Sequence, residues 1–243
     1  MYPPQPPPPR QGRKLMPQEK PMINTPQKIT GTLLLAALLF CWGGCAGALS
    51  PEAWAKTKGG NLNDLNATIN QDDETLAHLA AREGRVDVLI WLKQRGADLN
   101  TKRTPPSQSS LFVFNEDGGP TLMHFAAEGG HVQTMKWLKE QGGKNADVNA
   151  KASGWTPMHA AAEGGHLEAM KWLKEQGVDP KARNQNGQTA MHFAAGRGNL
   201  EAMKWLKDMG VSVSAKDYKG RTPLDLARDK EAISWLKAND KED

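Results

Sequence analysis

Short blocks of apolar residues at helical spacing alternate along the chain with glycine-rich breaks. In the clearest block, Leu167, Met170 and Leu173 lie three residues apart and share one face of a predicted helix. Small residues precede this block at 161–162, and a glycine pair at 164–165 separates the two. Glycine at such a break ends one helix and lets the chain reverse. The pattern predicts pairs of short helices, each leaving an apolar face that a neighbouring pair must cover.

Each predicted pair begins with a threonine that a histidine follows three residues later. The threonines are Thr75, Thr121, Thr156, Thr189 and Thr222, the last with Asp225 in place of the histidine. They are 46, 35, 33 and 33 residues apart, so the first two intervals contain insertions. A threonine hydroxyl at a helix start can accept from unpaired backbone N–H groups, and the histidine has the spacing to bond back to it. The chain is therefore a repeat array with a period of 33 residues.

In this threonine start, the alanine pair, the tight turn and the second helix, the chain resembles the ankyrin family. The resemblance extends from about Gly60 to Leu236. It implies an all-α fold, a solenoid of stacked helix-turn-helix units joined by β-hairpin-like loops. It also implies a scaffold whose concave side, formed by the loops and the first helices, binds a partner protein.

A tryptophan-leucine pair recurs in the second helix of every repeat. The tryptophans are Trp91, Trp137, Trp172, Trp205 and Trp235. A row of aromatic rings could bind sugars or bases by stacking. The family has an apolar residue at this position, however, and large rings between repeats would stabilise a stack. We therefore assign the tryptophans to the core.

The two ends of the array differ from its middle. Because Leu62, Leu65 and Ile69 have helical spacing, residues 56–74 are predicted to form an N-terminal capping helix. The repeats then occupy residues 75–243, with an insertion at 101–119. The last unit is shorter than its neighbours and ends in charged residues, as a polar C-terminal cap does.

The loop residues before the last three threonines do not belong to the packing pattern and are our candidate partner-binding residues. They are Trp155, Gln185, Asn186, Gln188, Tyr218, Lys219 and Arg221. Of these, Trp155, Tyr218 and Arg221 are the residue types most enriched at binding hot spots. An alternative for Trp155 is that it covers an adjacent loop.

The insertion supplies two further candidates, Phe112 and Phe114. Its start is rich in proline and serine, and an apolar cluster follows. Long loops of this kind often carry function. The phenylalanines either project from the repeats to bind a partner or fold back on the first repeat, and the sequence does not decide between the two.

An apolar run flanked by Lys28 and by small residues predicts a signal peptide at 29–55. Candidate cleavage sites follow Ala48 and Ala55, each preceded by a small-x-small pattern. Residues 1–28 form a basic, proline-rich segment predicted to be disordered, with Met22 as the preferred start of translation. The protein is therefore expected in the periplasm or outside the cell. The alternatives are an uncleaved membrane anchor at 29–49 and lipidation of Cys45.

The charge distribution argues against a nucleic-acid partner. The formal charge is +4, and residues 1–48 account for all of it, so the remainder holds equal numbers of basic and acidic residues. Attraction to phosphates requires clustered, uncompensated lysine and arginine. Both cysteines lie before residue 48, which excludes disulfides from the repeats.

The constellation that most suggests catalysis is the recurrent set of His124, Glu128 and His131, repeated at 159, 163 and 166. In each set the histidines straddle a helix and a turn, whereas a helical metal site needs them one turn apart. We therefore expect no enzyme activity, no metal and no cofactor. The expected function is an exported scaffold, a monomer that binds and protects or regulates a partner protein. The alternatives are a secreted effector that engages a host protein and, more distantly, a metal-dependent enzyme using these histidines.

Overall fold

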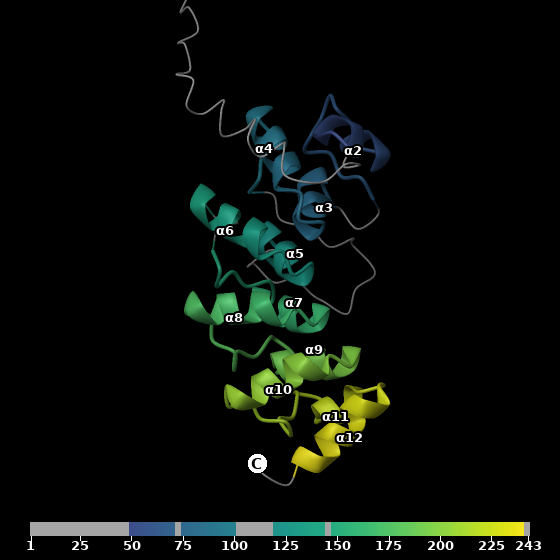
Figure 1. The fold of residues 1–243 in the computed structure, drawn as a ribbon, viewed down its shortest axis with the longest axis vertical. Coiled ribbons are helices and arrows are strands. Elements are labelled where there is room, and N and C mark those ends of the chain that lie inside the picture. The colour runs from purple at the N-terminus through teal and green to yellow at the C-terminus, as the bar shows by residue number, and fades with distance from the viewer. Residues whose placement is uncertain (1–48, 71–73, 101–118, 144–146, 241–243) are drawn as a thin grey trace, which may run out of the picture. The chain divides into compact units, whose positions relative to one another are not determined.

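The computed structural model describes residues 49–70, 74–100, 119–143 and 147–240, and all structural statements below refer to them. Helices account for its regular secondary structure (Figure 1). They are α2 (Pro51–Thr57), α3 (Leu76–Arg82), α4 (Val86–Gln94), α5 (Leu122–Glu128), α6 (Val132–Gln141), α7 (Pro157–Gly164), α8 (Leu167–Glu175), α9 (Ala190–Arg197), α10 (Leu200–Asp208), α11 (Pro223–Leu226) and α12 (Lys230–Asn239). Residues 29–48 of the predicted leader, with both cysteines, lie outside the described residues, as do Phe112 and Phe114. Residues 49–55 of the leader are described, and 51–55 belong to α2.

Successive helix pairs pack on one another in chain order. The first helices α3, α5, α7, α9 and α11 form one contact series, and α2, α4, α6, α8 and α10 form a second (Figure 1). The alanine pairs are fully buried in the first series, which lets these helices approach closely. The predicted all-α solenoid of stacked helix pairs is confirmed.

The threonine and histidine of each motif close the start of the first helix as predicted. In α7 the backbone N–H of Thr156 donates to Nδ1 of His159 at 3.1 Å, and the Thr156 hydroxyl lies 2.8 Å from the same nitrogen. Because Nδ1 accepts, the proton of the neutral ring is on Nε2. That Nε2 donates to the carbonyl of Gln188, in the next repeat, at 3.3 Å. The histidine therefore fixes its own helix and also links two repeats.

The same link recurs along the stack. Nε2 of His124 donates to the Trp155 carbonyl at 3.0 Å, and Nε2 of His192 donates to the Arg221 carbonyl at 3.3 Å. These histidines are buried with the alanines and would be costly to leave unpaired. The ladder of hydrogen bonds therefore satisfies buried polar groups and fixes the register of one repeat on the next.

The second histidine of each His-Glu-His set has a different role. His166 lies at the N-cap of α8, and its ring covers Gly130 of the preceding repeat. A Cβ atom at Gly130, where φ is +74°, would lie 2.4 Å from that ring. The glycine is needed for both the turn and this contact.

The tryptophan-leucine pairs lie in the core, as predicted, but the two partners are buried to different degrees. The leucines are fully buried, as Leu173 illustrates. Trp172 is 8% exposed, while the other four tryptophans are half-buried and pack against the core from its edge.

The predicted capping helix at 56–74 is wrong. The helix at this end is α2, which lies earlier in the chain and contacts α4, in the position of a second helix. Residues 58–70 form turns, because Asn61 and Asp64 accept hydrogen bonds from the backbone N–H groups of Asn63 and Asn66 at 3.0 and 3.1 Å. Such local bonds compete with a helix. The apolar residues of this segment still pack on the core, from turns instead of a helix.

Candidate partner-binding surface

Three loops precede the last three threonines, and we call them fingers: residues 147–155, 179–188 and 212–221. In the second finger, Asn184 is buried, and its Oδ1 accepts from the N–H groups of Asn186 and Gln188, both at 2.9 Å. In the third, Oδ1 of Asp217 accepts from the N–H groups of Lys219 and Arg221 in the same way. One buried side chain therefore shapes each of these two tips.

The first finger has Lys151 where the others have Asn184 and Asp217, and its tip is different. Ala152 and Trp155 pair through two backbone hydrogen bonds of 2.9 Å around Ser153 and Gly154. Both central residues have positive φ, +53° and +76°. This is the conformation of the tight turn that suits a twisted β-hairpin. Lys151 offers no acceptor side chain in that place, and the two backbone hydrogen bonds between Ala152 and Trp155 close the loop.

The fingers are bonded to one another. The N–H of Gln185 donates to the carbonyl of Ser153, and the N–H of Tyr218 donates to the carbonyl of Asn186, both at 2.9 Å. Arg183 also donates from its guanidinium to the carbonyl of Lys216. Side chains on these tips are therefore held on a rigid, continuous support, which reduces the entropy lost on binding.

Trp155 does not stand free of the fold. Its side chain is half-buried against the core, and its ring stacks on that of His124 at 5.2 Å with an interplanar angle of 14°. The expectation that Trp155 has no part in packing is wrong, because the His124 ring of the preceding repeat gives it a surface to cover. Its contact with a partner stays a prediction.

Arg221 is also engaged within the fold. Its guanidinium donates from Nε to Oδ2 of Asp217 at 2.9 Å, and a second nitrogen lies 2.8 Å from the same oxygen. Burial alone would raise the pKa of Asp217, but the hydrogen bonds from Arg221 and from finger N–H groups outweigh it and lower that pKa. The side chain of Arg221 remains partly accessible while it neutralises a buried carboxylate.

Tyr218 and Lys219 are the candidates that project most freely. The Tyr218 side chain is 75% exposed, rests on Gly187 of the preceding finger and lies beside Arg183, whose Cζ is 5.9 Å from the ring centroid. Lys219 is exposed next to it. Gln185, Asn186 and Gln188 are half-buried. The fingers therefore bring these five candidates together on one support.

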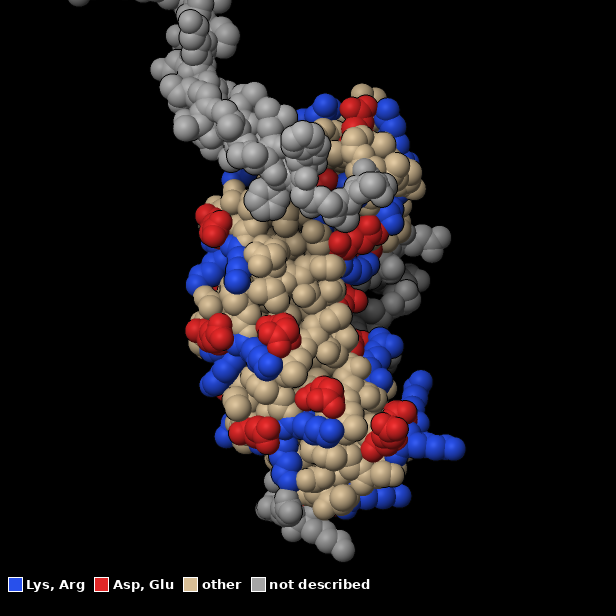
Figure 2. Space-filling view, in the orientation of Figure 1, with Lys and Arg blue, Asp and Glu red and all other residues tan. Residues whose placement is uncertain are grey.

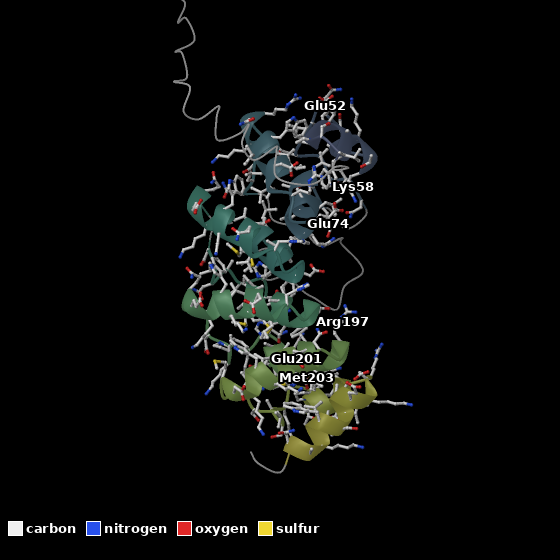
Figure 3. All side chains as sticks on the ribbon, in the orientation of Figure 1. Glu52, Lys58, Glu74, Arg197, Glu201 and Met203 are labelled. Carbon is white, nitrogen blue, oxygen red and sulfur yellow. The ribbon has the colours of Figure 1, made fainter. Side chains whose placement is uncertain are left out.

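A hollow of about 270 Å³ lies beside the fingers, between α9 and α11. Its lining residues are Glu163, Gln188, His192, Phe193, Gly196, Arg197, Leu226 and Arg228. Phe193 is held by an edge contact with the ring of His159, 5.5 Å between centroids, and stays half-buried. Arg197, marked in Figure 3, pairs with Glu163 of the preceding repeat at 2.7 Å.

Sequence reasoning missed this hollow. Phe193 and Leu226 each follow their threonine by four residues, where the third repeat has Ala160. Leu79 and Phe125 occupy the same position in the first two repeats, and Phe125 is buried in the core, so a large apolar residue there belongs to the packing of the first helices. Ala160 is the exception among the five repeats, and whether a side chain at this position lines a hollow depends on how neighbouring repeats pack.

The described residues hold no group of three or more His, Cys, Asp or Glu side chains that could bind a metal ion. His124 and His159 use Nδ1 at the start of their own helix and Nε2 in the link to the next repeat, so both ring nitrogens are engaged. In the same part of the chain, no helix combines the length and apolarity needed to cross a membrane.

Comparison with known families gives two matches. A family described as ankyrin repeats in many copies matches residues 123–173 and 158–207. A second family, described as ankyrin repeat, matches residues 72–101. No curated protein matches the chain.

Proposed function

The chain is an ankyrin-repeat protein, and from that premise we propose that it is an exported scaffold that binds a partner protein through its fingers and first helices. Ankyrin repeats are usually binding scaffolds without enzyme activity. Fold alone does not choose a surface or a partner. The side chains of the fingers are the reason for choosing this surface.

The observation that carries the proposal is the exposure of Tyr218 on a rigid tip. An aromatic side chain that is 75% exposed contributes little to the stability of the fold, whereas it can bury a large area against a partner. The backbone bonds between fingers hold it in place before binding, and the hollow at Phe193 lies next to the second finger through Gln188. Binding hot spots commonly combine an aromatic anchor with such a neighbouring hollow.

We expect Tyr218→Ala to weaken partner binding about tenfold or more, because it removes an aromatic anchor. The partner would be isolated with the tagged protein from fractionated cells and identified by mass spectrometry, and its affinity measured by calorimetry. The matched control is Ile90→Ala, which removes an exposed apolar side chain from α4, away from the fingers. Both variants should keep the parental melting temperature. Equal affinity of Tyr218→Ala and the parent would refute the finger surface.

Export is the second part of the proposal, and the start of the folded unit supports one cleavage site over the other. Ser50 accepts from the N–H of Ala53 at 3.3 Å as the N-cap of α2, and Arg85 donates to the carbonyl of Leu49 at 2.8 Å. Trp54 is buried, and its Nε1 donates to Glu83 at 2.9 Å. Cleavage after Ala55 would remove these contacts, whereas cleavage after Ala48 keeps them all.

The mature protein is therefore expected to begin at Leu49. Intact mass and N-terminal peptide sequencing of the protein purified from the cell envelope would measure this directly. A mature chain starting at Lys56 would contradict the expectation. A full-length chain in the membrane fraction would instead mean that the leader is an anchor and the scaffold is tethered.

A further inference from the structure

Basic side chains gather on the fingers and beside the hollow. The three fingers carry six basic residues and three acidic ones. Figure 2 shows Lys and Arg side chains projecting from the end of the stack that holds α11 and α12. Five exposed cations form no ion pair within the part of the chain that the structure describes. They are Lys181, Arg183, Lys216, Lys219 and Arg228.

The acidic side chains of the same region are satisfied by the fold. Asp217 is buried and bonded to Arg221, and Glu163 is paired with Arg197. Asp225 accepts from both the N–H and the hydroxyl of Thr222, at 2.7 and 2.8 Å. Asp179 accepts from a finger N–H. The carboxylates therefore stabilise tips and helix starts, while most of the cations face solvent without a counter-charge.

The hollow adds two apolar side chains to this basic surface. Phe193 and Leu226 line it from successive repeats, and Arg228 lies at its edge with Arg197. A small hollow with apolar side chains among polar ones, beside exposed cations that form no ion pair in the described residues, favours a segment that supplies both an apolar residue and negative charge. Complementary charge of this kind raises the rate of encounter and selects the partner.

We infer that the partner segment is an acidic peptide with an aromatic or large aliphatic residue, which fills the hollow between α9 and α11 while its carboxylates meet the finger cations. This inference rests on the proposed function and names the chemistry of the partner at that surface. Tyr218, beside Arg183, would cover the apolar part of the same segment.

The test uses a phage-displayed library of random peptides, selected on the immobilised full chain. Enriched peptides would be synthesised and their affinities measured for the parent and for two triple variants. Lys216→Glu, Lys219→Glu and Arg228→Glu together reverse the charge of the proposed surface. Lys136→Glu, Lys171→Glu and Lys204→Glu make the same change on exposed positions of α6, α8 and α10.

Acidic peptides with an aromatic or large aliphatic residue are expected to be enriched. Their affinity should fall about tenfold or more in the finger variant and less than about twofold in the helix variant. All six substituted residues are exposed, so the folded state should survive, which circular dichroism would check. Failure to enrich any peptide, enrichment of neutral or basic peptides, or equal losses in both variants would overturn the inference. A single-stranded oligonucleotide that binds the fingers more tightly than the peptides would overturn it as well.

The inference and the proposed function can fail separately. If the captured partner loses affinity with Tyr218→Ala but not with the finger charge reversal, the scaffold function stands and the acidic segment is wrong. If no partner protein depends on Tyr218, the function itself fails, whatever peptides the library yields.

Discussion

Trp172→Ala is expected to lower the free energy of unfolding by about 3–5 kcal/mol, the cost of replacing a buried large side chain with alanine. Trp172 is 8% exposed in α8, in the middle of the stack, where α8 contacts both α6 and α10. Removal of the indole leaves a cavity that helices held on both sides cannot close. Urea denaturation followed by circular dichroism would measure the loss.

The matched control for this variant is Trp235→Ala in α12. Trp235 occupies the same position of the last unit that the structure describes but is half-buried. Its truncation removes less apolar area from contact, so we expect a loss of about 1–2 kcal/mol. A loss below about 1 kcal/mol for Trp172→Ala, or equal losses in the two variants, would show that the tryptophan position does not hold the stack together.

The fold could be predicted because each repeat contains the residues that begin and end its own helices. Thr156 and His159 mark the start of a helix, Gly164 and Gly165 mark its end, and both signals depend on residues within a few positions of one another. Repetition in register then excludes chance agreement. The second role of His159, its bond to the Gln188 carbonyl, could not be predicted, because it depends on the position of the next repeat.

The candidate surface was predicted less well, for the same reason. Trp155 and Arg221 look free in the sequence, and their partners are His124, in another repeat, and Asp217, whose burial the sequence does not show. The N-terminal cap was misplaced because Asn61 and Asp64 close turns that override the helical spacing of the leucines. Local patterns predicted the elements, whereas contacts between repeats decided which side chains remain available to a partner.

The histidine ladder makes stability depend on pH. Burial is the main cause that lowers the pKa of His159 to about 4 from its usual 6.5, with hydrogen bonds to backbone carbonyls opposing it. The unfolded chain therefore binds more protons than the folded chain between those two values. The stability from the neutral ring is complete above pH 6.5 and is lost as pH falls towards about 4. The pKa of His192 is also lowered, first by burial, so it acts in the same direction.

His159 alone is expected to account for a loss of about 3 kcal/mol across this window, at about 1.4 kcal/mol for each unit of pKa difference. Burial raises the pKa of Glu128, and protonation of that carboxyl offsets a part of the loss near the acid end. Urea denaturation of the parent and of His159→Gln at about pH 7 and about pH 4.5 would separate the contributions. Glutamine keeps a polar side chain at the helix start but does not titrate, so its fall in stability should be smaller by about 2–3 kcal/mol. Parallel losses in the two proteins would mean that His159 is not the buried group that resists protonation, and that the links between repeats do not depend on its neutral ring.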